Sequence, residues 1–177
     1  MSLARLIPLC RRRWSIPILA RLSRVDGDRF VPLVHALDAG QEAVRETLAE
    51  LIEQGWVRPN PGYGHPLRPE YILTGKGARL APACVRLDDT LAALRLKDVC
   101  LRRWSLPALH VIGDGATRFS GIARQLGDVT DRALSMTLAS LDDAAIVARR
   151  LAEPRPARFD YILADTGATI HQILSDM

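Results

Sequence analysis

An internal repeat is the feature that most constrains what this chain can fold into. Arg12-Arg-Trp-Ser-Ile-Pro-Ile-Leu19 returns as Arg102-Arg-Trp-Ser-Leu-Pro-Ala-Leu109, which places the two tryptophans 90 positions apart. Further matches follow in the same order: Arg29-Phe30 with Arg118-Phe119, Thr47-Leu48 with Thr137-Leu138, and Glu70-Tyr-Ile-Leu73 with Asp160-Tyr-Ile-Leu163. Because these matches keep their order with one net adjustment, they indicate a duplication rather than chance. Two copies are too few for a typical solenoid, so they predict two small domains or one pseudo-symmetric body.

The repeat sets the expected domain boundaries. We expect a first unit over residues 1–87 and a second over residues 88–177, joined by a helical connection over about residues 76–101. A chain of 177 residues is long enough for two small domains, each with a modest core. No stretch rich in Gly, Pro or Ser separates the units, so we expect the connection to be stiff.

Composition narrows the class of protein. Apolar residues make up 48% of the chain and charged residues 25%, which is typical of a soluble globular protein. The net charge of +4 is compatible with a polyanionic partner but does not require one. The basic cluster Arg11–Arg13 follows the apolar N-terminal stretch, the reverse of a secretory signal, and no apolar run is long enough to span a membrane. Three cysteines without a CxxC pair favour a reducing compartment, so we expect a cytoplasmic protein.

Each copy begins with a helix. Ser15 and Ser105 stand just before apolar runs, where a serine hydroxyl can cap the first free backbone N–H groups. Pro17 and Pro107 then fall in the first helical turn, where a proline costs no hydrogen bond. We therefore interpret the shared Trp-Ser-x-Pro as a helix start, with its tryptophan packed in the core.

Two more helices follow in each copy. Apolar residues spaced three, one and three apart predict short helices over Phe30–Leu37 and Phe119–Leu126. After a tight turn, a leucine stripe predicts a third helix from about Gln41 to Gln54 and from about Asp131 to Asp143, with Thr130 as an N-cap. Two helices joined by a tight turn form a helix-turn-helix.

A hairpin completes each copy. Strands are expected at 55–57 and 71–73, and again at 145–147 and 161–163, with tips rich in Pro and Arg between them. Helix resumes at Gly77 and at Gly167, and in the first copy it runs toward Cys100 with a break near Asp88-Asp89. The predicted fold class is mainly α with small β-hairpin wings: a tandem duplicated winged helix-turn-helix with pseudo-two-fold symmetry.

With its elements in this order, the chain resembles the HxlR family of winged-helix transcription regulators over essentially its whole length, twice. That family has a Gly-Gly-Lys-Trp-Thr-like helix start, a Gly-x-x-Arg-Phe segment, a Ser-x-Arg-x-Leu recognition helix, a basic wing and a Tyr-x-Leu-Thr-x-x-Gly turn. The counterparts here are Arg12-Arg-Trp-Ser15, Gly27-Asp-Arg-Phe30 and Tyr71-Ile-Leu-Thr-Gly-Lys-Gly77 in the first copy, and Arg102-Arg-Trp-Ser105, Gly115-Ala-Thr-Arg-Phe119 and Val129-Thr-Asp-Arg-Ala-Leu-Ser-Met-Thr-Leu138 in the second.

The chain also departs from the family pattern. Both copies lack the Gly-Gly before the tryptophan, and Gln41-Glu42 replaces the Ser-x-Arg start of the first recognition helix. In the second copy Ala164-Asp165 replaces Thr-x, and Ala145 replaces the glycine at the start of the wing. Family members usually carry one unit per chain and form homodimers. The resemblance therefore implies a covalent pseudo-dimer here, acting as a monomer or as a homodimer of such chains.

Double-stranded DNA is the partner that this resemblance implies. The third helix would enter the major groove, where base edges distinguish all four base pairs. The polar positions of that helix are the candidate contacts: Gln41, Arg45 and Thr47 in the first copy, and Thr130, Arg132, Ser135 and Thr137 in the second. Thr47 and Thr137 are weaker candidates because each precedes a core leucine. The alternative is that all these residues form ordinary solvated helix faces.

Arginines gather on the two predicted wings, where they would contact phosphates or the minor groove. They are Arg58, Arg68, Arg149, Arg150, Arg155 and Arg158. Arg29 and Arg118 precede the second helix of each copy and could reach phosphates.

The sequence gives no sign of an enzyme or of a cofactor. It contains no P-loop, GxGxxG, metal-ligand cluster or nucleophile elbow, and the histidines His35, His65, His110 and His171 are scattered. Cys10 and Cys100 occupy equivalent positions, and relatives of this fold often sense oxidants through cysteine, which makes these two residues redox candidates. The alternative is that both are small buried apolar residues.

A protein-interaction or dimerisation module is the main alternative function, with one or both units no longer binding DNA. Acidic Glu42 and Glu46 on the first recognition helix favour this alternative for the first copy. A small-molecule or oxidant effector is a further partner that the sequence leaves open.

Overall fold

The computed structural model describes residues 2–60, 69–154 and 157–177. The chain divides into two compact units: residues 12–89, which we call the first-repeat unit, and residues 1–11 together with 90–177, which we call the second-repeat unit. The division by compactness therefore assigns the first eleven residues to the unit formed by the second repeat. Helix α1 (Leu3–Leu9), which the sequence pattern did not predict, packs on helix α7 (Ser105–Gly113) of that unit and buries Leu6 and Leu9.

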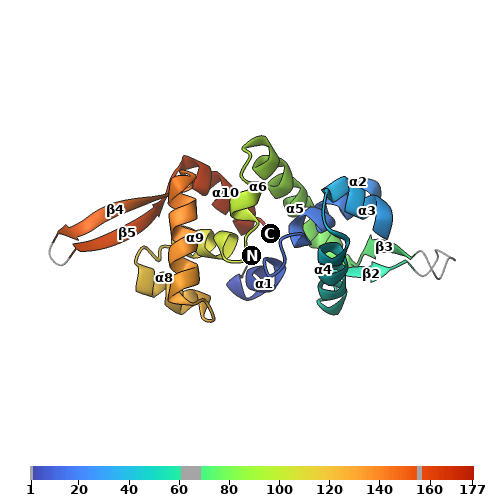
Figure 1. The fold of residues 1–177 in the computed structure, drawn as a ribbon, viewed down its shortest axis with the longest axis horizontal. Helices are drawn as coiled ribbons and strands as arrows, with labels where there is room; N and C mark the ends of the chain where they lie inside the picture. Colours follow the sequence, from blue (N-terminus) through green and yellow to red (C-terminus); the bar gives the residue numbers. More distant parts are fainter. Residues whose placement is uncertain (1, 61–68, 155–156) are drawn as a thin grey trace. The chain divides into compact units, whose positions relative to one another are not determined.

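The first-repeat unit has the predicted helices and hairpin strands in the predicted order (Figure 1), with one further short strand over Asp28–Arg29 that was not predicted. Its elements are α2 (Ser15–Val25), β1 (Asp28–Arg29), α3 (Phe30–Leu37), α4 (Gln41–Glu53), β2 (Val57–Pro59), β3 (Glu70–Leu73) and α5 (Gly75–Ala93). The strands form an antiparallel sheet in the order β1-β3-β2, in which Val57 pairs with Leu73 and Asp28 pairs with Tyr71.

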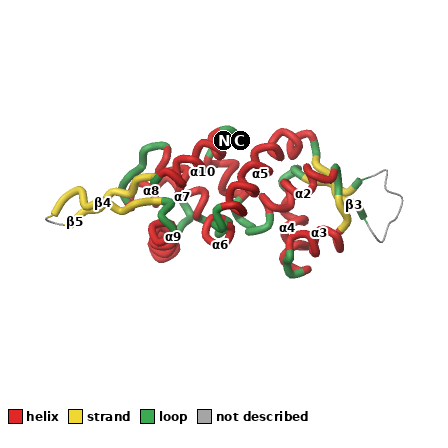
Figure 2. Tube along the Cα trace, turned by 90° about the horizontal axis from the view of Figure 1, so that it is seen from above, coloured by secondary structure: helices red, strands yellow, loops and turns green. Residues whose placement is uncertain are grey.

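The second-repeat unit repeats this plan with longer described strands in its hairpin, which the tube drawing of Figure 2 also shows. Its further elements are α6 (Lys97–Cys100), α8 (Phe119–Leu126), α9 (Asp131–Asp143), β4 (Val147–Pro154), β5 (Ala157–Leu163) and α10 (Asp165–Ser175). Strands β4 and β5 pair antiparallel from Val147 opposite Leu163 outward, with an irregularity between Leu151 and Glu153. Where the first repeat has β1, the backbone N–H of Tyr161 donates to the Thr117 carbonyl at 2.7 Å.

The predicted apolar stripes form the core of each unit, as amphipathic helices require. In α4 the stripe is Val44, Leu48 and Leu51, and all three side chains are buried. In α9 it is Leu134, Leu138 and Leu141, also buried. These stripes fix which face of each third helix is turned outward.

The helix starts confirm one prediction and correct another. Pro17 and Pro107 lie in the first turn of α2 and α7, as expected. The prediction that Ser15 and Ser105 are N-caps is wrong, because each is already the first helical residue and its side chain is buried. The capping residues are the tryptophans Trp14 and Trp104, and neither makes a side-chain capping bond.

Two glycines explain the shared turn after the hairpin. A Cβ on Gly77 would lie 2.1 Å from the carbonyl oxygen of Trp56, and a Cβ on Gly167 would lie 2.1 Å from that of Ile146. The same two carbonyls accept hydrogen bonds from the backbone N–H groups of Thr74 and Ala164, each at 3.0 Å. The helix that follows each hairpin therefore presses its backbone directly on the residue just before the hairpin's first strand, which only glycine permits.

The predicted break in the connecting helix is wrong in position. Helix α5 continues through Asp88 to Ala93, and the chain turns only at Arg95, whose φ is 57°. Asp88 is buried and accepts a hydrogen bond from Arg24 at 3.1 Å, so its carboxylate stabilises the helix on α2 instead of ending it. Helices α5 and α10 also begin two residues before the predicted glycines, at Gly75 and Asp165. Within the described ranges, no helix has the length and apolar character needed to cross a membrane.

Candidate nucleic-acid interface

Helix α9 presents a polar outer face that begins at its N-terminus. The Thr130 side chain accepts a hydrogen bond from the backbone N–H of Ala133 at 3.2 Å, which confirms its capping role. Arg132 and Ser135 are exposed, and Thr137 is half-buried, with its hydroxyl donating to the Ala133 carbonyl at 2.8 Å. The hydroxyl of Thr137 is therefore used inside the helix, while Arg132 and Ser135 point away from the core.

The structure adds one residue that the sequence analysis missed. Met136 is 62% exposed on α9, next to Ser135, although methionine is usually buried. The helical period alone could have placed Met136 on the outer face, because Leu134 and Leu138 define the inner one. An exposed apolar side chain on this face suits contact with the methyl group of thymine.

The corresponding face of α4 is acidic and internally paired. Arg45 donates to Glu42 at 2.6 Å, and its guanidinium also lies 5.2 Å from the centre of the Phe30 ring. Arg12 bridges Glu46 at 2.5 Å and Glu50 at 3.1 Å. The acidic groups of this face are therefore engaged in ion pairs with arginines. Among the predicted contacts of α4, Arg45 is bonded to Glu42, whereas Gln41 is exposed and belongs to none of these pairs.

Thr47 is the predicted contact that the structure places in the core. Its side chain is 1% exposed, and its hydroxyl donates to the Ala43 carbonyl at 2.6 Å. The residue satisfies its hydrogen bond inside the helix, as threonine in a helix commonly does, so it is not on the surface that a ligand would meet.

Arginines line the hairpin of the second-repeat unit. Arg149 and Arg150 are exposed on β4, and the Arg149 guanidinium lies 3.6 Å from the centre of the Phe159 ring on β5. This stacking holds the guanidinium on the hairpin face without using its hydrogen-bond donors. Arg158 lies in β5 opposite Glu153.

Of the two arginines predicted to contact DNA on the first hairpin, the structure describes one. Arg58 is exposed on β2. Arg68 and Arg155 lie outside the described residues.

Arg118 lies at the base of the second hairpin. Its side chain is 48% exposed, and its Nε lies 3.7 Å from the Asp160 carboxylate, which also accepts a hydrogen bond from the Thr117 hydroxyl at 3.2 Å. The carboxylate orients the arginine and leaves much of its guanidinium open to solvent.

A cleft of about 780 Å³ lies beside α4 in the first-repeat unit. Arg29, Phe30, Arg45, Ile52 and Tyr71 are among its lining residues. The cleft thus combines an apolar floor with two arginines, an environment that suits part of a larger partner or a small molecule.

All three cysteines are buried. Burial raises the pKa of the Cys100 thiol to about 12, and burial together with the nearby Asp88 raises that of Cys84 to about 12. Thiolate is the form that oxidants attack, so these surroundings favour unreactive thiols. The redox role of Cys10 and Cys100 stays a prediction.

Comparison with known proteins places this geometry in a family. The profile of the HxlR-like helix-turn-helix family matches residues 9–95 and again residues 99–177. A helix-turn-helix transcriptional regulator of unstated function from Methanothermobacter thermautotrophicus is 32% identical over 72 residues, which are 41% of this chain and 55% of that protein. The chain thus spans about half the length of this relative.

Two Bacillus subtilis proteins are also similar. The helix-turn-helix regulator YvaP, also of unstated function, is 30% identical over 80 residues, covering 45% of this chain and 74% of YvaP. The regulator YodB is 26% identical over 76 residues, covering 43% of this chain and 68% of YodB. No solved structure matches significantly. Two successive profile matches over nearly the whole sequence, on two winged helix-turn-helix units, show that the chain belongs to the HxlR-like helix-turn-helix family of transcriptional regulators.

Proposed function

We propose that this protein is a sequence-specific transcription regulator that binds duplex DNA, with the second-repeat unit supplying the main contact. The observation that carries the proposal is the outer face of α9. There Arg132, Ser135 and Met136 are exposed together on the helix that follows the turn. A guanidinium can bind guanine through two hydrogen bonds, a hydroxyl can bind a base or a phosphate, and a thioether can contact a thymine methyl.

The hairpin of the same unit supplies charge for the DNA backbone. Arg149 and Arg150 on β4 and Arg118 at the hairpin base are exposed, and each suits a phosphate or the minor groove. Arg155 and Arg158 belong to the same proposed wing. Contacts of this kind fix the register of α9 on the duplex but carry little sequence information.

The first-repeat unit contributes a weaker contact in this proposal. Glu42 occupies the position equivalent to Arg132, so a carboxylate replaces the guanidinium where the helix would meet bases. Gln41 and Arg58 are its exposed candidates for DNA, and Arg45 is already bonded to Glu42. One chain with two unequal units then acts as a covalent pseudo-dimer that reads two unlike half-sites.

Selection of bound sequences from a random duplex library tests the proposal with the full chain. We expect two unlike half-sites about one helical turn apart, the spacing that paired helix-turn-helix units read. A perfect palindrome recovered with one chain bound would contradict unequal units, and failure to enrich any sequence would contradict specific binding.

A charge exchange at the equivalent positions tests the assignment of the two units. Arg132→Glu should lower affinity for the selected duplex by more than the roughly 5- to 150-fold that loss of one arginine–guanine pair costs, since it also adds repulsion. Glu42→Arg should raise affinity, because a guanidinium then replaces a carboxylate on a helix that faces DNA. If both variants bind like the parent, α9 does not enter the groove.

A protein-docking role for the first-repeat unit is the second candidate, favoured by the paired acidic face of α4. In that case Glu42→Arg would leave DNA affinity unchanged at every salt concentration. Removing the DNA-binding side chains of α9 together with Arg118, Arg149 and Arg150 would then abolish all binding, because the first-repeat unit would bind no phosphate of its own.

A further inference from the structure

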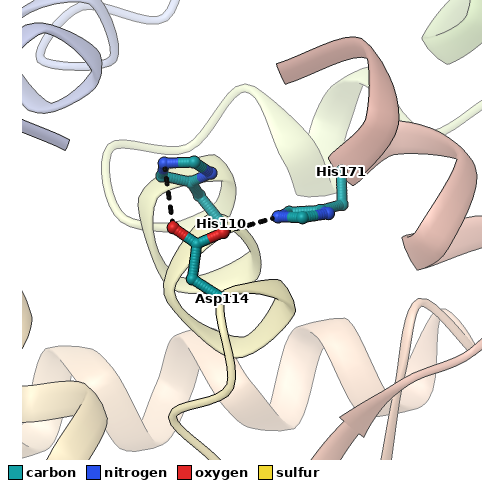
Figure 3. A group of neighbouring side chains, drawn as sticks. All are labelled: His110, Asp114 and His171. Carbon is teal, nitrogen blue, oxygen red and sulfur yellow. Dashed lines mark hydrogen bonds and ion pairs between the residues drawn. The ribbon is translucent and has the colours of Figure 1, made fainter. Parts of the chain in front are cut away.

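Three side chains from two segments that lie far apart in the sequence meet at one end of α7. His110 and Asp114 lie one turn apart at the C-terminal end of this helix, and His171 projects toward them from α10 (Figure 3). One carboxylate oxygen of Asp114 lies 3.0 Å from Nε2 of His171, and the other lies 3.5 Å from Nε2 of His110. The carboxylate thus stands between two imidazole rings whose centres are 5.6 Å apart.

We propose that His110, Asp114 and His171 bind a divalent first-row transition metal ion, with Zn²⁺ as the expected occupant. Imidazole nitrogen and carboxylate oxygen are the ligands that such ions prefer in proteins. Metal–ligand bonds of about 2.0–2.2 Å in a tetrahedral site place ligand atoms about 3.3 Å apart. The three ligand atoms here all lie within 4.8 Å of one another, so side-chain movements of about 1.5 Å or less complete the site.

The surroundings of the three residues suit a site with one open position. The His110 side chain is 7% exposed and that of His171 is 20% exposed, so both rings are held by packing. The Asp114 side chain is 53% exposed, which leaves a route for the ion and room for a water molecule as a fourth ligand.

Gly113 provides a second, independent observation. A Cβ at this position would lie 2.2 Å from Cδ2 of His171, so the absence of a side chain is what admits the imidazole. The first repeat provides the internal comparison, because its equivalent residues are Ala20, Ser23, Arg24 and Ala81. All four positions that build the site in the second repeat therefore differ in the first, where Arg24 instead bridges Asp88 and Asp89 of α5.

A bound ion would clamp the last helix to the core of its unit. Helix α10 is already anchored by buried Ile170 and Leu174, and the metal would add a link from His171 to both α7 residues. The site lies outside the proposed DNA-binding residues, and the inference does not depend on the proposed function.

The test uses the full chain without a histidine tag, stripped of metal with a chelator. Calorimetric titration with Zn²⁺ should show one ion bound per chain, and Co²⁺ in its place should give the visible absorption of a low-symmetry nitrogen and oxygen site. His171→Ala and Asp114→Ala should each weaken Zn²⁺ binding by more than about 100-fold, since even losing an outer partner of a ligand costs about 10- to 100-fold. Gly113→Ser keeps all three ligands but displaces His171, so it should weaken binding as well.

His35→Ala is the matched control, because His35 is an exposed histidine on α3 and should not affect binding. His171→Ala introduces the residue that the first repeat has at the equivalent position, Ala81. Circular dichroism without metal checks that each variant folds. Absence of binding by the parent chain at millimolar Zn²⁺ would overturn the proposal. Equal binding by the parent and by His171→Ala would overturn it too, because the ion would then lie elsewhere.

Discussion

Replacing Gly77 by alanine tests the close approach between α5 and Trp56, the residue just before β2. The new Cβ would lie 2.1 Å from the Trp56 carbonyl oxygen, whereas Cβ atoms essentially never come within 3.0 Å of such an atom. The helix must therefore retreat by about 0.9 Å or more, which a packed backbone resists. Because the same carbonyl accepts the Thr74 N–H at 3.0 Å, the retreat also breaks that hydrogen bond.

The magnitude follows from three contributions to the free energy of unfolding. Overpacking costs about 1–3 kcal/mol, and the broken hydrogen bond costs about 1 kcal/mol. The better helix propensity of alanine returns at most about 1 kcal/mol. The net loss is about 2 kcal/mol, which lowers the melting temperature of a unit of this size by roughly 8–16 °C.

Gly75→Ala is the control in the same helix. A Cβ at Gly75 meets nothing within 4 Å, so this variant should be as stable as the parent or slightly more stable. Thermal and urea unfolding followed by far-ultraviolet circular dichroism measure both variants in the full chain. Gly167→Ala repeats the experiment in the second-repeat unit, where a Cβ would lie 2.1 Å from the Ile146 carbonyl oxygen. If Gly77→Ala unfolds within about 0.5 kcal/mol of Gly75→Ala, the steric reasoning is wrong.

Three further predictions concern the wing, the turn before it and the thiols. Arg149→Ala or Arg150→Ala should reduce the slope of log affinity against log salt concentration by about 0.9 for each phosphate that the variant no longer neutralises, while Arg45→Ala should leave the slope unchanged; equal slopes for all would exclude phosphate binding by the wing. Ala145 has a φ of 52° where the first repeat has Gly55 at 71°, so Ala145→Gly should stabilise the second-repeat unit by up to about 1 kcal/mol, and a lower melting temperature would refute this. Thiol reagents should modify the folded chain far more slowly than the urea-unfolded chain, because raising the pKa of Cys100 from 9.0 to about 12 leaves roughly 1000-fold less thiolate; equal rates would contradict its burial. Above pH 9 the Cys100 thiol of the folded chain stays protonated, whereas that of the unfolded chain ionises. The raised pKa should therefore lower the free energy of unfolding as pH rises above 9, by about 1.4 kcal/mol per pH unit for each such thiol, and have no effect on it below pH 9.

The helices whose ends carry a chemical signal were predictable from the sequence. Helix α9 begins and ends where expected, because Thr130 caps it and three leucines fix its inner face. Helix α1 was missed because it has only seven residues, with a proline among them, and its stability comes from packing Leu6 and Leu9 against a segment distant in sequence. Local pattern does not report such tertiary packing.

Tertiary packing also explains why the capping prediction for the two serines was wrong and why the proximity of two histidines was missed. Ser15 looked like a cap, but its side chain is buried and it is the first residue of the helix, with Trp14 in the capping position. His110 and His171 looked scattered, because about 60 positions separate them and only the pairing of α7 with α10 brings them together. The local signals were the His110–Asp114 spacing and the glycine between them, and neither points to a third residue.

The two repeats share contacts that stabilise the fold and differ at the residues proposed to bind DNA or a metal ion. Arg12 bonds to Glu50 of α4, and its counterpart Arg102 bonds to Ser140 of α9 at 3.2 Å, so the helix start contacts the third helix in both. Gly77 and Gly167 preserve the same close approach. Both contacts serve stability, which each unit needs whatever it binds.

Some of the differences fall on the residues proposed to bind DNA or a metal ion. Glu42 opposes Arg132 on the third helix, and Ala81 opposes His171 on the last helix. In the second repeat a guanidinium, a hydroxyl and a thioether lie on one face of α9, and two imidazoles and a carboxylate lie at one end of α7. Joining two units in one chain allows such divergence, because a homodimer must carry every substitution in both halves. The pattern therefore fits both proposals, in which the second-repeat unit carries the DNA-binding face and the metal site, while the first-repeat unit keeps the fold and a paired acidic surface.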